Sequence, residues 1–378
     1  MRQIGKSSLS QLLYYFLKLG TSGFGGPVAL IGFMHRDLVE KRGWISEEEY
    51  KQGLALAELA PGPLAAQLAI YLGYVDFGIW GATLTGFVFV LPSFLMVLAL
   101  GWAYTLYGGL PWMHSVFYAV GACVIGIITN SVYKLTRKTL KGDKLLWLIF
   151  AVLLAVTVIA ESEIVWLFLG GGVLVWFLKA PPWKGKTPKV PLLAVFPFSL
   201  GISQPGILMQ IFIFFAKAGT LVFGSGLAIV PFLYGGVVKE HHWLTDQQFL
   251  DAVAVAMITP GPVVITVGFI GYLVAGLPGA CVAALSTFLP CYLFVIILAP
   301  YFRKHGKKPG LVAFVDGVTA AAIGAIAGAV IILGRRSVVD IPTALIALAT
   351  AFILWKTKKI PEPVIVIIAA ILGLVLSK

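Results

Sequence analysis

Apolar runs long enough to cross a membrane recur along the chain, with shorter polar or glycine-rich segments between them. Clear examples are 78–102, 116–132 and 363–377. A helix needs about 20 apolar residues to cross the roughly 30 Å of hydrocarbon in a bilayer. The runs do not alternate apolar with polar residues, as the strands of a membrane β-barrel do. With 59% hydrophobic and 12% charged residues, the chain differs from soluble domains, and we expect an all-α polytopic membrane protein.

The charges, cysteines and histidines of the chain fit this class and point to no other chemistry. The net charge of +12 comes from short Lys and Arg clusters between apolar runs, a pattern typical of cytoplasmic loops rather than of a nucleic-acid-binding face. The three cysteines lie in apolar segments without a CxxC spacing, and the five histidines show no metal-ligand spacing. We therefore expect no nucleic acid, cofactor or metal. No cleavage site follows the first apolar run, so a retained N-terminus is also expected.

One sequence unit occurs twice in the chain. The segment FLKLGTSGFGG beginning at Phe16 returns as FAKAGTLVFGS from Phe215, and the PGP of 61–63 returns at 260–262, both at an offset of 199. After one deletion the match continues at an offset of 198, for example from Pro92 to Pro290. Such a period indicates two homologous halves, which we place at 1–189 and 190–378, with a junction near 179–189.

The charges of equivalent loops predict that the two halves have opposite orientations. The loop 107–114 has no Lys or Arg, whereas its counterpart 301–310 has four. The loop 134–144 has five, whereas its counterpart has only Arg335 and Arg336. Basic residues concentrate on the cytoplasmic side of a membrane, so a reversal of charge between copies is the pattern of an inverted repeat.

An inverted repeat requires an odd number of crossings between its copies. With the basic loops placed in the cytoplasm, an odd number of crossings predicts a cytoplasmic N-terminus and a non-cytoplasmic C-terminus. We expect the protein in the inner (plasma) membrane. The expected crossings of the first half are 78–105, 113–133, 144–160 and 163–179, with 190–203 as the fifth.

Breaker segments divide stretches that are too short to cross the membrane alone. GTSGFGG separates 9–19 from 28–39, and Pro61-Gly62-Pro63 separates 50–60 from 64–75. Each stretch has about 11 to 12 residues, at a helical rise of about 1.5 Å per residue. We interpret each pair as a re-entrant helical hairpin and expect four hairpin tips to meet near mid-membrane. Irregular backbone is tolerated there only if it lines a polar cavity or is buried in protein.

The breaker segments carry groups suited to binding an anion. Helices that begin after them present free N–H donors and a positive dipole end. Lys18 and Lys217 occupy the same repeat position, and a lysine in lipid is costly unless it is paired or functional, although it can also snorkel to an interface. A tetrahedral oxyanion accepts many hydrogen bonds, so clustered donors suit it. The candidate anion-binding residues are Lys18, Thr21, Ser22, Gly25, Gly26, Gly62, Lys217, Thr220, Gly224, Ser225 and Gly261.

Three further polar residues near the breakers are candidates for coupling or for lining the site. Glu58 precedes PGP, and its repeat counterpart is Met257. Its carboxyl could couple transport to protons or instead pair with a lysine. Gln67 and its counterpart Thr266 could line the site or bond a neighbouring helix.

Several segments resemble the chromate ion transporter family over nearly the whole chain. They are FLKLGTSGFGGPVA, EKRGWISEEEY, APGPLAAQ and the LPSF of 91–94. The resemblance implies a two-domain member with inverted halves that exports chromate and draws on the proton motive force, giving chromate resistance. In the second half FGSG replaces FGGP, and Glu58 stands where family members often have glutamine.

The residues alone predict an inverted-repeat transporter of a small anion, with alternating access to a site between the halves. Chromate comes from the resemblance, and sulfate or another small oxyanion is the alternative substrate because it shares the charge and tetrahedral shape. The expected partners are this oxyanion and the lipid bilayer. A homodimer is one assembly that such an architecture permits.

A serine protease is a second interpretation of the first breaker. Gly20-Thr21-Ser22-Gly23 matches the GxSG of rhomboid-type intramembrane proteases, which need a histidine base within reach of the serine. No histidine lies inside an apolar segment, and the repeat has Leu221 in the position of the serine. We therefore expect a transporter and not an enzyme.

Overall fold

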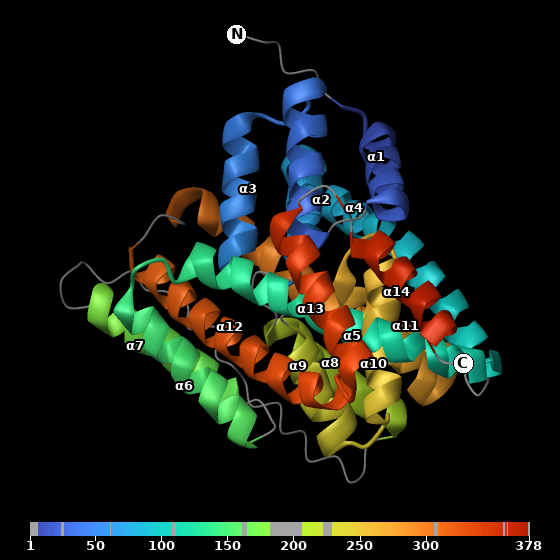
Figure 1. Cartoon of the computed structure of the whole chain (residues 1–378). Coiled ribbons are helices and arrows are strands. Elements are labelled where there is room, and N and C mark those ends of the chain that lie inside the picture. Colours follow the sequence, from blue (N-terminus) through green and yellow to red (C-terminus); the bar gives the residue numbers. More distant parts are fainter. Residues whose placement is uncertain are drawn as a thin grey trace.

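A computed structural model of the chain shows two sets of helices in the same order (Figure 1). It describes residues 7–23, 26–60, 62–107, 111–160, 165–181, 206–221, 229–305, 309–357, 360 and 362–376. The helices of the first set are α1 (Leu9–Ser22), α2 (Gly26–Met34), the π-helix η1 (His35–Lys41), α3 (Glu47–Leu59), α4 (Leu64–Tyr107), α5 (Pro111–Thr139), α6 (Lys144–Ala160) and α7 (Val165–Lys179). Those of the second set are α8 (Ile207–Leu221), α9 (Val230–Leu233), the π-helix η4 (Tyr234–Glu240), α10 (Asp246–Ile258), the 3₁₀-helix η5 (Val263–Ile265), α11 (Thr266–His305), α12 (Pro309–Ser337), α13 (Ile341–Lys356) and α14 (Glu362–Leu376).

The predicted repeat is confirmed at the level of single elements. The two π-helices η1 and η4 begin and end at equivalent residues, 199 apart, and α5 and α12 do so at 198. The long helices α4 and α11 are each kinked at an equivalent glycine, Gly78 (φ 62°) and Gly276 (φ 60°). Positive φ favours glycine because it has no Cβ. The predicted boundary between 64–75 and 78–105 is therefore a kink within α4.

The helices that follow η1 and η4 begin at equivalent capping boxes. The Ser46 hydroxyl accepts the Glu49 N–H at 3.2 Å, and the Glu49 carboxylate accepts the Ser46 N–H at 3.3 Å. Thr245 and Gln248 make the same two bonds at the start of α10, at 3.2 and 3.0 Å. Reciprocal bonds of this kind satisfy N–H groups that a helix leaves open at its start. They fix the start of α3 and α10, the helices that lead to the two PGP breakers.

The two halves interlock through their last helices. The helices α6 and α7 of the first half pack on α12 of the second, and α13 and α14 of the second half pack on α5 of the first. Figure 1 shows α6 and α7 alongside α12. The same figure places α1–α3 at one end of the molecule and α8–α10 toward the opposite end. Each half therefore completes part of its packing with helices from the other.

The outer surface of the long helices is apolar. In the described residues, four helical stretches are long and apolar enough to cross a membrane: 64–107, 118–137, 263–300 and 312–335. Along α4, Trp80, Phe87, Leu95 and Trp102 are exposed at intervals of about two helical turns. Exposed apolar stripes of this size are rare on soluble proteins, and they fit contact with lipid. The predicted fifth crossing, 190–203, lies outside the described residues.

Candidate functional site

The breaker segments of the two halves meet. The Gly261 N–H, in the PGP of the second half, donates to the Gly23 carbonyl at 3.0 Å, directly after the end of α1. Ser93 of α4 is fully buried at the same place, with its hydroxyl 3.4 Å from the Gly20 carbonyl. The expected meeting of breaker segments is confirmed for this pair. Residues 24–25, 61 and 222–228 lie outside the described residues.

Gly261 is held where no side chain fits. A Cβ at this position would lie 2.0 Å from the Ser93 hydroxyl oxygen, and the backbone has φ +93°. Gly62, its counterpart, has φ +143°, and a Cβ there would lie 3.0 Å from the Cβ of Cys291 in α11. Cys291 is the repeat counterpart of Ser93. Each PGP thus packs on the long helix of the other half, so the same contact is made twice.

Gly20 and its repeat counterpart Gly219, each followed by a threonine, allow close helix packing. A Cβ at Gly20 would lie 2.3 Å from the Phe89 carbonyl oxygen, and one at Gly219 would lie 2.2 Å from that of Thr287. These glycines allow α1 to lie close against α4, and α8 close against α11. The repeat of Gly20 and Gly219 is therefore explained by two close helix contacts, apart from any ligand.

The predicted cationic and hydroxyl donors lie at the ends of α1 and α8. Lys18 and Lys217 are exposed on the protein surface. Each hydroxyl donates to a carbonyl of its own helix: Thr21 to Leu17 at 2.7 Å, Ser22 to Lys18 at 2.8 Å and Thr220 to Lys217 at 2.7 Å. Such bonds to the preceding turn are common for Ser and Thr in helices. To donate to an anion, these hydroxyls have to rotate away from the helix.

The remaining predicted residues occupy the PGP regions. Glu58 lies in the last turn of α3, and its side chain is outside the described part. Gln67 is fully buried, and its amide nitrogen would lie 2.5 Å from a Cβ on Gly62. Thr266 is buried, and its hydroxyl donates to the Val263 carbonyl at 2.8 Å. Gly26 begins α2, whereas Gly25, Gly224 and Ser225 are outside the described residues.

Ser93 and Cys291 are the site residues that the sequence analysis did not select. Both follow a leucine-proline pair, in LPSF of 91–94 and LPCY of 289–292. The sequence contained a signal for these two residues, because the two motifs occupy equivalent positions of the repeat. Ser93 is a polar residue in an apolar helix. If the halves are assumed to meet, a contact between Ser93 and the PGP glycine of the other half can be predicted.

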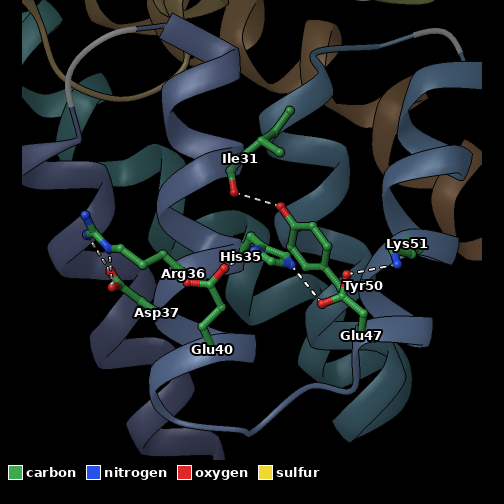
Figure 2. Close-up of polar contacts among 8 residues, drawn as sticks. All are labelled: Ile31, His35, Arg36, Asp37, Glu40, Glu47, Tyr50 and Lys51. Carbon is green, nitrogen blue, oxygen red and sulfur yellow. Dashed lines mark hydrogen bonds and ion pairs between the residues drawn. The ribbon is translucent and has the colours of Figure 1, made fainter. Parts of the chain in front are cut away.

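A cluster of polar side chains joins η1 to the first turns of α3 (Figure 2). The two ring nitrogens of His35 lie 3.2 Å from a Glu40 carboxylate oxygen and 2.9 Å from one of Glu47. Nearby, the Tyr50 hydroxyl donates to the Ile31 carbonyl at 2.7 Å. The residues equivalent to His35 and Glu47 also bond in the second half, where the Tyr234 hydroxyl donates to Asp246 at 2.7 Å. The contact thus fixes the same pair of elements in both halves.

The η1–α3 contact is expected to weaken in acid. The hydrogen bond with His35, followed by that with Lys51, holds the pKa of Glu47 below its ordinary value of 4.5. A lowered pKa stabilises the fold above the ordinary value, and the contribution is lost as pH falls through the lowered pKa. We expect Glu47→Gln to lower the melting temperature in detergent at pH 7, and the difference from wild type to shrink below about pH 4.5. Glu48→Gln, at a neighbouring exposed position, is the control, and a difference that stays constant with pH would contradict the assignment.

Comparison with known proteins identifies the family. A family model described as "Chromate transporter" matches residues 10–176 and 209–374, one match in each half. The chain belongs to the chromate transporter family. It is 69% identical over 374 residues to a "Chromate transport protein" of Cupriavidus metallidurans, covering 97% of this chain and 93% of the relative. It is 62% identical to a "Probable chromate transport protein" of Synechococcus elongatus (97% and 95% covered) and 32% identical to a "Chromate transport protein" of Pseudomonas aeruginosa (96% and 91% covered).

The family match agrees with the architecture. Its two matched segments coincide with the two sets of helices, α1–α7 and α8–α14. The resemblance stated from the sequence motifs is thereby confirmed, and this member of the family is a multi-pass helical membrane protein. No solved structure gives a significant match to the chain.

Proposed function

We propose that the protein transports chromate across the membrane. The observation that carries the proposal is the 69% identity, over nearly the whole of both chains, to a relative named chromate transport protein. The geometry supports it, because breaker segments of two homologous halves meet at Gly23 and Gly261 among apolar helices. Broken helices at a repeat interface are where secondary transporters hold their substrates.

The chromate dianion binds near the meeting of the breakers, with Lys18 and Lys217 supplying positive charge. In this proposal the anion is bound by first-turn N–H groups of the helices that follow the breakers, α2 and α4 in the first half, because N–H groups at a helix start have no partner within the helix. The Gly261 N–H is bonded to the Gly23 carbonyl in this conformation, so its use by the anion requires the two tips to separate. Chromate binding is therefore linked to the breaking of this Gly261–Gly23 hydrogen bond, which we call the tip contact.

The two halves lie in opposite orientations. This is supported by the reversed charge of equivalent loops and by the position of α1–α3 and α8–α10 toward opposite ends of the molecule (Figure 1). The basic loops then lie in the cytoplasm, with the N-terminus on that side and the C-terminus on the other, in the inner membrane. The site opens alternately to each side, driven by the proton motive force in the direction of export.

The interlocked helices limit which parts move. Since α6 and α7 pack on α12, and α13 and α14 on α5, whole sequence halves cannot separate without breaking both contacts. The moving parts are the broken-helix units, α1–α4 against α8–α11, within the frame of α5, α12 and the helices packed on them. The glycine kinks at Gly78 and Gly276, inside α4 and α11, are suitable hinges within these units.

Labelled chromate flux into liposomes that contain the purified protein tests the proposal. We expect uptake that exceeds protein-free liposomes, increases with an imposed pH gradient and falls in excess sulfate. Uptake of sulfate or another anion without chromate uptake would show that this anion, and not chromate, is the substrate. If folded protein moved no anion, the transport function would be refuted.

A further inference from the structure

A buried carboxyl of the second half contacts the first half. It lies in α10, the helix that leads to the tip contact. Asp251 of α10 is 3% exposed. One of its oxygens accepts the Tyr104 hydroxyl, from the end of α4 in the first half, at 2.7 Å. The other accepts the Gln247 side-chain amide, one turn earlier in α10, at 2.8 Å. Its repeat counterpart is Gln52, so this carboxyl has no equivalent in the first half.

No basic residue neutralises Asp251 within the described part of the chain. The helix α10 packs against α4, α5, α11, α14, η4 and η5. From these elements, Tyr104 is the one described titratable group that contacts the carboxyl. The other charged groups of these elements whose side chains the structure describes are Asp76 in α4, Lys134 and Arg137 in α5, and Lys239 and Glu240 in η4. The side chains of His114, Lys138, Arg303, Lys304, His305 and Glu362 lie outside the described part.

This environment accommodates both protonation states of the carboxyl. Burial without a cation disfavours a carboxylate, whereas two hydrogen bonds from neutral donors favour it. When the carboxyl is protonated, its O–H can donate to the Tyr104 oxygen or to the Gln247 amide oxygen, since both groups also accept hydrogen bonds. A carboxyl paired with lysine would instead remain charged. The neutral partners therefore suit a group that gains and loses a proton.

The position of Asp251 connects it to the substrate region. The helix α10 runs from Asp246 to Ile258 and leads directly into the PGP of 260–262. In that segment the Gly261 N–H bonds the Gly23 carbonyl of the first half. The Tyr104 and Gly23 contacts are both made by the first half to this one segment of the second. A change at one contact can thus be transmitted to the other through a single helix.

We propose that Asp251 carries the coupling proton, binding it on one side of the membrane and releasing it on the other in each transport cycle. The inference rests on the proposed proton-linked transport and names the group responsible. In the loading step an O–H bond forms between an Asp251 carboxylate oxygen and a proton delivered by water. In the release step that bond breaks and the proton returns to water on the opposite side. Protonation rearranges the Tyr104 contact and, through α10, favours opening of the tips.

The experiment separates coupling from substrate transport. Full-length wild type and Asp251→Asn are placed in liposomes containing a pH-sensitive dye. Accumulation of labelled chromate under a pH gradient is measured, and so is chromate–chromate exchange without a gradient. We expect the variant to lose gradient-driven accumulation and chromate-induced proton movement while it retains exchange. Asp246→Asn, which alters another carboxyl of α10 bonded to a tyrosine, is the matched control and should keep all three activities.

Two further variants test the role of the carboxyl itself. Asp251→Glu keeps a titratable group and should restore proton movement. Tyr104→Phe removes a bond that favours the carboxylate, so the half-maximal pH of transport should move upward. Gradient-driven accumulation by folded Asp251→Asn would overturn the assignment, as would loss of exchange in both Asp251 variants. Chromate flux by the wild type that ignores the gradient would instead refute proton coupling, while leaving chromate transport intact.

Discussion

Gly261→Ala is expected to abolish chromate transport. The new methyl group would lie 2.0 Å from the Ser93 hydroxyl oxygen, and the backbone would have to hold φ +93° with a side chain present. Backbone strain of this kind costs about 1–3 kcal/mol, and overpacking of a filled interior typically costs about 1–3 kcal/mol more. Movement of PGP away from α4 relieves the contact but breaks the Gly261–Gly23 hydrogen bond, so the variant loses the closed conformation to which the two tips return in each transport cycle. Flux in liposomes and melting temperature in detergent measure the two consequences.

A second substitution tests whether the steric contact is the cause. Ser93→Ala removes the hydroxyl oxygen and leaves Cβ, which lies 3.2 Å from the added methyl. We expect Ser93→Ala to restore part of the melting temperature lost in Gly261→Ala, with the φ strain remaining. Gly32→Ala is the matched control, because a Cβ there meets nothing within 4 Å. Wild-type flux by Gly261→Ala would show that the tips are not held as described.

Removal of the two repeated lysines is expected to weaken chromate binding strongly. A hydrogen bond to a charged group contributes about 1.5–3 kcal/mol, which corresponds to roughly a ten- to hundredfold higher half-saturating concentration for each lysine that binds the anion. Lys18→Ala and Lys217→Ala should therefore each raise this concentration, and the double variant should raise it further. The dependence of labelled chromate uptake on concentration measures the effect.

The lysine experiment also distinguishes substrate binding from general charge. Lys144→Ala removes an exposed lysine at the start of α6 and should leave uptake unchanged. Lys18→Arg keeps the charge and should retain most binding. If both alanine variants transported chromate as wild type does, the two lysines would not bind the anion, and their repetition would have another cause.

Much of the helical architecture could be predicted from the sequence because the bilayer restricts the choices. Apolar runs without alternation must form helices whose backbone is bonded internally, and the repeated breakers indicate where those helices end. The ends of α1 and α3 fall at the predicted breakers. The interlock of α6 and α7 with α12 could not be predicted. Their sequences are apolar on every side, so no pattern distinguishes the face that meets protein from the face that meets lipid.

The candidate site was predicted in composition more than in contacts. The sequence interpretation placed Gly62 and Gly261 among the anion-binding residues, and in the structure both pack against the long helix of the other half. The predicted roles of Lys18 and Lys217 stay predictions. Asp251 was not predicted because the candidates were chosen in the breaker segments and close beside them, whereas Asp251 lies nine residues before the PGP of 260–262. Its distinguishing feature is a tertiary contact with Tyr104, which lies 147 positions away in the sequence.

A chromate-bound structure of the protein in a lipid nanodisc tests most directly whether the two halves bind the anion between their broken helices. We predict a tetrahedral density at the breaker segments of 20–26 and 260–262, within hydrogen-bonding distance of N–H groups and of at least one of Lys18 and Lys217. The Gly261 N–H should have left the Gly23 carbonyl. Density at the basic loop 134–144 instead, with the breakers unchanged at saturating chromate, would contradict the account.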